Sequence, residues 1–116
     1  MITSDKRLKV FARDEYLCQV CGKHISVNGS PQLAHRIRQG KQAEKHCMIY
    51  IWNKYNKDRS HNWCKDFIID SDLNLLSTCS LECNSRCNIF FKSIERDNLI
   101  DEIIEQTECL KYEKIY

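Results

Sequence analysis

Cys18-Gln19-Val20-Cys21-Gly22 is the stretch that decides the fold, because it places two thiols close together before a glycine that permits a tight turn. This is the form of a zinc knuckle, in which the turn directs both sulfur atoms at one ion. A second pair of thiols follows much later in the chain, at Cys79 and Cys83. Structural zinc takes four ligands in a tetrahedron, most simply two such pairs. The sequence therefore predicts one structural Zn²⁺ bound by Cys18, Cys21, Cys79 and Cys83.

The chain contains eight cysteines among 116 residues, although its first residues, Met1–Arg7, lack the apolar core of a signal peptide. A chain without an export signal is kept in a reducing compartment, where structural disulfides are rare. The thiols are therefore expected to be metal ligands or buried apolar groups. Cys87 follows Cys83 at a helical spacing and is an alternative ligand in place of Cys79 or Cys83. Three cysteines lack such partners and are predicted to be isolated thiols: Cys47, Cys64 and Cys109.

Length and composition indicate a single globular domain over residues 1–116, since domains usually contain about 50 to 250 residues. Apolar residues make up 42% and charged residues 29%, with one proline and three glycines, which excludes disordered and collagen-like chains. The longest apolar stretches are far shorter than a membrane span. We therefore expect a cytoplasmic domain that does not bind a membrane.

The net charge of +2 conceals an uneven distribution. Residues 1–65 hold 13 basic and 5 acidic side chains, a net +8, whereas residues 66–116 hold 5 and 11, a net −6. Tyrosines and tryptophans are interleaved with the basic residues of 38–66, and such rings stack on bases while cations release counterions from phosphates. This pattern predicts a nucleic-acid face and an acidic helical half that faces away. The alternative is a solvated basic surface whose aromatics only pack a long insertion.

Hydrophobic periodicity predicts the secondary structure of an α+β domain. The expected segments are a helix or extended segment at 5–17, a strand at 31–37, an insertion at 38–66 with helix from 43 to 55, a turn and strand at 67–76, and a C-terminal helix at 97–112. Three thiols and two amides recur at four-residue spacing, which predicts one helical face. They are Cys79, Cys83 and Cys87, with Asn84 and Asn88.

Four strings in a fixed order carry a family resemblance. They are Arg13-Asp14-Glu15-Tyr16-Leu17-Cys18-Gln19-Val20-Cys21-Gly22, Ala34-His35-Arg36-Ile37, Leu73-Asn74-Leu75, and Thr78-Cys79 followed by Cys83-Asn84. They resemble the HNH endonucleases of the ββα-metal (His-Me finger) superfamily, over residues 7 to about 104. The stretch 34–41, Ala-His-Arg-Ile-x-Gln-x-Lys, is similar to a phage-type subgroup. The resemblance implies a small treble-clef-like finger in which a zinc ion holds a hairpin against a helix.

The resemblance also implies a metal-dependent DNA endonuclease that hydrolyses phosphodiester bonds. A lone histidine on a strand is more often structural, but within this motif His35 is the candidate general base, since neutral imidazole can take a proton from water. Asn84 occupies the position of the last motif residue, and its amide oxygen suits Mg²⁺ or Mn²⁺. Asn74 corresponds to the middle residue, whose family role is to brace the loop that orients the base; the alternative is an ordinary turn residue at the end of a strand. Asn88 is either a further ligand or outer-shell partner, or a polar residue on the helix surface.

The chain departs from the family at Ala34, where many members have an aspartate or histidine that binds the catalytic metal. Mg²⁺ usually keeps several waters, so Asn84 as its one protein ligand is physically tolerable; otherwise Asn88, Asp70 or Asp72 completes the site. Four basic side chains are candidates for contacts to the DNA phosphates or for plain backbone contacts. They are Arg36, Arg38, Lys41 and Arg86.

Two other functions stay open at this point. Ala34 is compatible with a zinc-stabilised nucleic-acid-binding module that has lost cleavage. A Cys₄ module that binds another protein is the third alternative. For an endonuclease with one site per chain, cutting both strands needs either a homodimer or two successive events.

Overall fold

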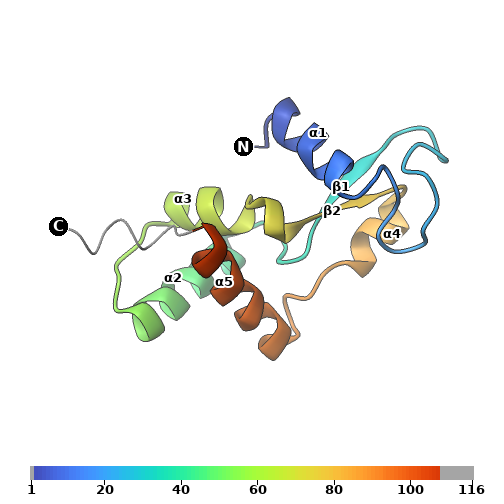
Figure 1. Ribbon diagram of the computed structural model, residues 1–116. Helices are drawn as coiled ribbons and strands as arrows, with labels where there is room; N and C mark the ends of the chain where they lie inside the picture. The colour runs from blue at the N-terminus through green and yellow to red at the C-terminus, as the bar shows by residue number, and fades with distance from the viewer. Residues whose placement is uncertain (1, 108–116) are drawn as a thin grey trace.

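The computed structural model describes residues 2–107, in which the strands are short and most of the ordered chain is helical (Figure 1). The elements, in chain order, are α1 (Ser4–Arg13), β1 (Gln32–His35), α2 (Lys41–Tyr55), α3 (His61–Cys64), the π-helical turn η1 (Lys65–Ile69), the 3₁₀ turn η2 (Asp72–Asn74), β2 (Leu75–Thr78), α4 (Leu81–Arg86) and α5 (Ser93–Thr107). The α+β class expected from the sequence is confirmed. Cys109 and positions 108–112 of the expected C-terminal helix lie outside the described residues.

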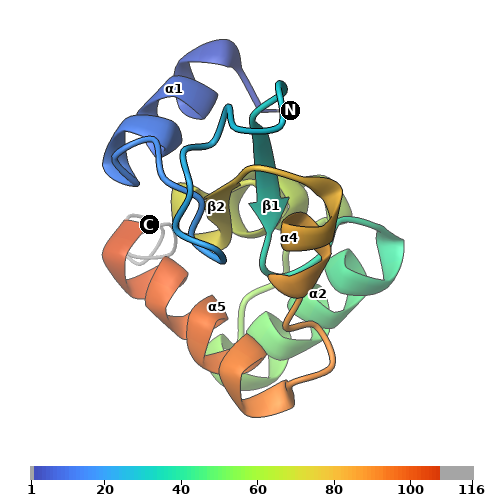
Figure 2. The ribbon, with the colours of Figure 1, turned by 90° about the vertical axis from the view of Figure 1, so that its right-hand side faces the viewer.

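Strands β1 and β2 form a two-stranded antiparallel sheet, with Gln32 opposite Thr78 and His35 opposite Leu75. Helix α4 packs against β1, and α1 packs against β2 (Figure 2). β1 is shorter than the strand predicted at 31–37. The prediction of the second strand within 67–76 is wrong in position, because η1 and η2 occupy most of that segment and β2 begins only at Leu75. The pairing ends after His35 because Asn74, the next residue on the opposite side, belongs to η2 and donates its N–H to the Ser71 carbonyl oxygen at 2.9 Å. Only Arg36 N–H still follows the register, by donating to the Asn74 carbonyl oxygen at 2.8 Å.

Helix α1 settles the alternative that the sequence left open for residues 5–17. Thr3 caps its first turn by accepting from Lys6 N–H at 3.2 Å, which favours a helix over an extended segment. At its other end, Arg13 donates to the carbonyl oxygens of Asp72 and Leu75 at 2.7 and 2.6 Å. Hydrogen bonds from a charged donor are stronger than neutral ones, so they hold α1 firmly against β2 and the turn before it.

The segment between the strands supplies much of the hydrophobic core, although its sequence showed no clean period. Ala43, Cys47 and Ile51 lie at four-residue spacing on α2 and are all buried, which gives the helix one apolar stripe. The stripe is hard to detect because exposed apolar residues interrupt the opposite face, among them Ile49 and Trp52. The core cluster consists of Ile37, Ala43, Cys47, Ile51, Cys64, Ile68, Ile69, Ile89, Phe90, Leu99, Ile100, Ile103 and Ile104.

Helices α2 and α5 lie side by side and are joined by polar contacts (Figures 1 and 2). The Asp101 carboxylate accepts hydrogen bonds from Tyr50 at 2.9 Å, Tyr55 at 2.8 Å and Lys54 at 2.6 Å. Burial raises the pKa of Asp101, but the hydrogen bonds from Lys54, Tyr55 and Tyr50 outweigh burial and hold this pKa below its usual value. Asp101, a residue of the acidic half, therefore faces the basic insertion and neutralises one of its lysines.

Helix α5 begins at Ser93, before the start expected at 97. Asp97, which the sequence analysis placed at the helix start, is therefore inside the helix, where it lies 2.8 Å from His46 Nε2 and 3.0 Å from Arg96 Nε. Burial raises the pKa of Asp97, but its hydrogen bonds with Arg96 and His46 lower the pKa more. Within residues 2–107, no helix has both the length and the apolar character needed to cross a membrane.

We expect Asp101→Asn to lower the free energy of unfolding by about 1–2 kcal/mol at pH 7, because hydrogen bonds to a charged group contribute more than neutral ones. The folded-state pKa of Asp101 is depressed, so the carboxylate stabilises the fold above about pH 4, and this contribution is lost as the pH falls through the folded-state pKa. The difference from wild type should therefore shrink below pH 4. Urea denaturation at pH 7 and pH 3 measures it.

Glu105→Gln is the matched control, because Glu105 is an exposed carboxylate on the same helix. It should change stability by less than about 0.5 kcal/mol at either pH. Equal losses in the two variants at pH 7 would mean that the contact with α2 contributes nothing specific.

Candidate functional site

Four thiols converge at one end of the sheet, as the sequence predicted. The sulfur atoms of Cys18, Cys21, Cys79 and Cys83 all lie within 4.8 Å of one another. Tetrahedral zinc with Zn–S bonds of about 2.3 Å places its sulfurs about 3.8 Å apart. The measured Sγ–Sγ distances of 3.5 Å for Cys21 and Cys79 and 4.0 Å for Cys79 and Cys83 bracket that value. The cluster can therefore hold a metal ion such as zinc.

The first thiol pair is positioned by a turn that its own backbone closes. Gly22 has φ of +78°, a left-handed conformation that favours glycine, and its N–H donates to the Cys18 carbonyl oxygen at 2.9 Å. Cys18 N–H in turn donates to the Lys23 carbonyl oxygen at 2.7 Å. Gln19 N–H donates to Ser77 O at 2.9 Å, which places this turn beside β2.

The second thiol pair spans the junction between β2 and α4. Cys79 directly follows the strand, and Ser80 caps the helix by accepting from Cys83 N–H at 3.1 Å. The expectation that Cys79, Cys83 and Cys87 share one continuous helix is therefore wrong, because only Cys83 lies within α4. The helix cap, rather than helical periodicity, brings Cys83 back toward Cys79.

Hydrogen bonding shifts the pKa of two thiols of this cluster in opposite directions. Burial raises the pKa of Cys18, but backbone N–H groups at Cys21, Val20 and Cys79 outweigh it, and the net pKa is lowered. Burial raises the pKa of Cys79, and hydrogen bonds to the neighbouring thiols raise it further. The backbone is therefore arranged to stabilise a thiolate at Cys18, which is the form of cysteine that binds a metal.

The cysteines outside the cluster that the structure describes, Cys47, Cys64 and Cys87, are buried. Cys87 was an alternative ligand, but its thiol donates to the Cys83 carbonyl oxygen at 3.4 Å, and it does not belong to the four-thiol group. Burial raises its pKa, with further contributions from Cys18 and Cys83. Cys47 and Cys64 are both fully buried in the core, where burial raises the pKa of Cys47 to about 12 with a contribution from Cys64. These two thiols therefore act as apolar core residues.

His35 is the last residue of β1, and a buried carboxylate holds its ring. Its Nε2 lies 3.0 Å from Oδ1 of Asp70, and the side chains of the two residues are 12% and 2% exposed. Lys6 on α1 donates to the carbonyl oxygen of Asp70 at 2.7 Å, which anchors the turn that carries this carboxylate. Within residues 2–107, Nδ1 of His35 makes no hydrogen bond. The ring is therefore held through one nitrogen while the other is left for a different partner.

Asn74 is fully buried and clamps the chain directly after His35. Its Oδ1 accepts from Ile37 N–H at 2.7 Å, and its Nδ2 donates to the carbonyl oxygens of Ile37 and Ile69 at 3.0 and 2.7 Å. Buried backbone groups that lack partners destabilise a fold, so these contacts hold the loop in one conformation. Asn74 therefore fixes the residues that directly follow His35.

Asn84 links helix α4 to the strand that carries His35. Its Nδ2 donates to Oε1 of Gln32 at 3.3 Å and to the Leu33 carbonyl oxygen at 3.2 Å. Among the residues that the structure describes, its Oδ1 has no hydrogen-bond donor. An amide oxygen left in this way is a suitable ligand for a hard cation such as Mg²⁺.

Asn88 does not share a helical face with Asn84, because α4 ends at Arg86. Its Oδ1 accepts from Phe90 N–H at 2.8 Å, so it caps the turn before α5. The atom expected to bind a cation already has a backbone partner. Of the alternatives named from the sequence, Asp70 contacts His35, and Asp72 lies 3.1 Å from Lys9 Nζ.

The four basic candidates lie in different surroundings. Arg36 is half-buried directly after His35, and Lys41 is exposed at the start of α2. The Arg38 guanidinium lies over the rings of Phe90 and Phe91, 4.7 and 4.9 Å from their centroids. Arg86 is paired with the exposed carboxylate of Glu82 at 2.8 Å. Within residues 2–107, therefore, Arg86 and Arg38 already have partners, and Lys41 is the exposed candidate without an ion pair.

The sequence analysis missed two contacts of this site. It considered Asp70 only as a metal ligand, whereas the structure pairs it with His35. The usable signal was an acidic residue directly after the apolar run Phe67-Ile68-Ile69, since buried carboxylates are rare unless they are paired. Nothing in the sequence indicated the contact between Lys6 and Asp70, because the two residues are far apart in the chain.

Comparison with known proteins gives no match: no family model, no curated protein and no solved structure is similar enough to this chain. The resemblance to HNH endonucleases therefore has no independent support from relatives. The functional argument depends on the residues and distances described above.

We expect the purified protein to carry about one zinc ion per chain, and Cys83→Ser to remove the metal together with most of the folding stability. Structural zinc contributes binding energy directly to folding, so loss of one ligand should unfold the region around β2 and α4. Elemental analysis and thermal denaturation followed by circular dichroism measure both effects.

Cys87→Ser is the control for this change, because Cys87 lies four residues further on but outside the cluster. It should keep the metal. A protein without metal whose melting temperature equals that of the metal-loaded form would contradict a structural role for the cluster.

We expect Asn74→Ala to lower the free energy of unfolding by about 3 kcal/mol or more, because it leaves buried backbone groups of Ile37 and Ile69 without partners. Asn74→Asp keeps the acceptor for Ile37 N–H but loses both donated hydrogen bonds, so it should also destabilise. Asn53→Ala, at an exposed site on α2, should have little effect. Urea denaturation of the three variants tests this, and equal stabilities would rule out the clamp.

Proposed function

We propose that the protein is a metal-dependent DNA endonuclease of the HNH type, built on a small ββα-metal finger with a structural zinc ion. The observation that carries this proposal is the setting of His35, which ends a strand of the finger and is held by the buried carboxylate of Asp70 at 3.0 Å. Polar contacts of this kind are needed where a base must keep one orientation. Asn74 holds the loop that follows, and Asn84 contacts the same strand.

His35 acts as the general base. The Asp70 carboxylate accepts a hydrogen bond from Nε2–H, which selects the tautomer with an unprotonated Nδ1. Nδ1 then takes a proton from the water that attacks phosphorus in line with the departing 3′ oxygen. Because the carboxylate stays next to the ring, it stabilises the imidazolium that this proton transfer produces.

Asn84 would hold the divalent ion through Oδ1, together with water molecules and phosphate oxygens of the substrate. When it is bound, a Mg²⁺ or Mn²⁺ ion neutralises charge on the phosphoryl and leaving oxygens. Ala34 is fully buried, so the position that carries a second metal ligand in many family members is here part of the packed interior. We therefore expect weak binding of the catalytic metal in the absence of DNA.

The four-thiol cluster supports this site without taking part in the chemistry. It joins the knuckle at Cys18 to the end of β2 and to α4, the helix that carries Asn84. A zinc ion there would fix α4 against β1 and so keep Asn84 beside the strand of His35. Zinc is the metal that we propose, because four thiolates with tetrahedral spacing favour it.

A zinc-stabilised nucleic-acid-binding module without cleavage is the second candidate. Ala34 favours it, since an alanine cannot bind the catalytic metal. The geometry of His35 and Asp70 favours the endonuclease, because a protein that only binds nucleic acid has no need to orient an imidazole.

We expect the wild-type protein to nick or cut supercoiled plasmid in Mg²⁺ or Mn²⁺, and His35→Ala to reduce the rate by at least about 100-fold, the usual effect of losing a general base. Agarose electrophoresis over time measures the loss of supercoiled DNA. His61→Ala is the control, because His61 is an exposed histidine whose carboxylate partner, Glu44, is 3.7 Å away.

Circular dichroism and zinc content must match between the variants before their rates are compared. Binding of DNA without cleavage by the wild type and His35→Ala alike would favour the binding module. If the protein neither binds nor cleaves DNA, the remaining candidate function is a Cys₄ module that binds another protein. Equal cleavage by wild type and His35→Ala would exclude His35 as the base.

A further inference from the structure

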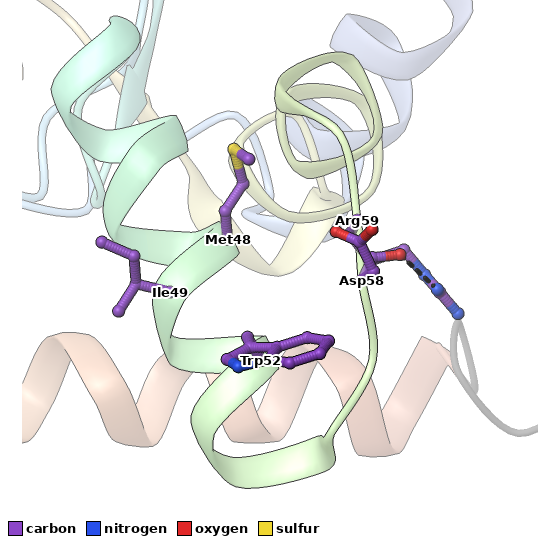
Figure 3. A pocket seen from close by; sticks show the side chains of 5 residues that line it. All are labelled: Met48, Ile49, Trp52, Asp58 and Arg59. Atoms are coloured by element: carbon purple, nitrogen blue, oxygen red, sulfur yellow. Dashed lines mark hydrogen bonds between the residues drawn. The ribbon is translucent and has the colours of Figure 1, made fainter.

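A small pocket lies between the exposed face of α2 and the segment that follows this helix. Its volume is about 190 Å³, and it is lined by Met48, Ile49, Trp52, Asp58 and Arg59. Figure 3 shows Met48 and Trp52 extending from α2 toward the segment with Asp58 and Arg59. Arg59 is engaged locally, since it donates to the Asp58 carbonyl oxygen at 2.7 Å and lies 5.1 Å from the Trp63 ring centroid. No residue of this pocket takes part in the proposed catalytic site.

The wall of the pocket formed by α2 is unusually apolar for a surface. Ile49 and Trp52 are 50% and 55% exposed, and together with Met48 they lie on one face of the helix. Large apolar side chains grouped in this way on a surface mark a binding site more often than chance exposure. The buried stripe on the opposite side of α2 supplies the core, and Met48 packs against that core from the edge of this second face. Ile49 and Trp52 remain exposed.

The charges around the pocket favour an anionic ligand with a flat ring. Lys45 lies on the same helix face, one turn before Met48 and Ile49, and Lys41 lies one turn further. Both lysines are exposed and make no ion pair within residues 2–107. The nearby Glu44 is half-buried and lies 3.7 Å from His61. A phosphate chain can therefore follow the lysines toward the pocket.

The volume limits what can enter. The pocket volume is about 190 Å³. Pockets for drug-sized ligands are larger, at about 300–1,000 Å³, so a complete nucleotide cofactor is too large. One planar ring system fits, with the Trp52 ring as its stacking partner. The exposed Asp58 carboxylate accepts hydrogen bonds but cannot donate them. It therefore favours nucleobases that carry an exocyclic amino group as a donor.

We propose that this pocket binds one unpaired nucleobase of a single-stranded nucleic acid, with the base stacked on Trp52 and its phosphates along Lys45 and Lys41. The inference rests on the proposed function to the extent that both need a nucleic-acid substrate. Trp52 lies about 16 Å along α2 from Lys41, the first residue of the helix, at 1.5 Å per residue. That length corresponds to about five base steps of 3.4 Å. The base bound in the pocket would therefore lie several nucleotides along the nucleic-acid strand from the nucleotide next to Lys41, the end of α2 that is nearer to His35 in the chain.

The test uses the full chain with Trp63→Phe, which leaves Trp52 as the one tryptophan of the two in the sequence. The probes are oligodeoxynucleotides of about 12 nucleotides, within the site sizes of single-strand binding folds. Oligo(dC) and oligo(dA) should quench Trp52 fluorescence and bind at least about five-fold more tightly than an abasic oligomer of equal length and charge. Equal binding of the abasic oligomer would overturn the inference, because charge alone would then explain the affinity.

Variants in the pocket give a second readout through the anisotropy of a labelled oligo(dC). Trp52→Ala should weaken binding at least about five-fold, whereas Trp52→Phe, which keeps a ring, should retain most of it. Ile94→Ala is the control, because Ile94 is 77% exposed on α5 and outside the pocket. An unchanged affinity in Trp52→Ala, or an equal loss in Ile94→Ala, would overturn the inference.

Asp58→Asn tests how the base is recognised. The wild type should prefer oligo(dC) to oligo(dT), and Asp58→Asn should remove this preference with little change for oligo(dT). Oligo(rC) should bind as well as oligo(dC), because the pocket contacts the base; a preference of more than about tenfold for one sugar would overturn base recognition. If no oligomer changes the Trp52 fluorescence, the proposal that the pocket binds a nucleobase is also overturned. A side chain of a partner protein would then be the remaining candidate ligand of the pocket.

These titrations contain no divalent ion and are repeated with His35→Ala, so they do not depend on cleavage. Binding without any plasmid cleavage would support the pocket and contradict the endonuclease. Plasmid cleavage without quenching of Trp52 would contradict only the pocket.

Discussion

Four thiols converge at the end of the two-stranded sheet, and the placement of β1, β2 and α4 depends on this cluster. An isolated two-stranded sheet is marginal in water, and a helix as short as α4 does not form alone. The cluster joins both to the knuckle at Cys18, within 4.8 Å between sulfur atoms. Metal bonds there would replace the hydrophobic core that these short elements cannot build. Asn84 on α4 and His35 on β1 owe their relative placement to this junction.

A second constraint, the packing of α2 against α5, organises the other end. The same two helices share an apolar core and a polar seam in which Asp101 accepts hydrogen bonds from Tyr50, Lys54 and Tyr55. Net charge per half of the chain misleads here, because one lysine of the basic insertion is already neutralised by the acidic helix. The exposed lysines of α2 that remain without ion pairs within residues 2–107 are therefore more informative about binding than the total charge.

Local spacing was enough to predict which four thiols cluster and the α+β class, because both depend on short-range geometry. The limits of helix α4 were not predictable from four-residue recurrence, since the Ser80 cap and the turn at Asn88 override it. Asp70 and Lys6 meet only through tertiary packing, so their contacts with the His35 turn had no signal at short range. The core role of the insertion was missed for a related reason, because α2 carries apolar residues on two faces. One face packs in the core, whereas the other, with Trp52, stays exposed.

This division of α2 connects the two proposed sites physically. The chain passes directly from His35 through the Asn74 clamp at Ile37 into α2, and Ile37 is itself part of the core that the helix covers. A ligand on the exposed face of α2 would therefore be connected to His35 through a short segment that Asn74 clamps at Ile37. Rigid connections of this kind favour a fixed distance between a binding pocket and a reacting group. If both proposals are correct, the length of α2 sets the distance between the phosphodiester bond cleaved near His35 and the nucleobase bound at Trp52.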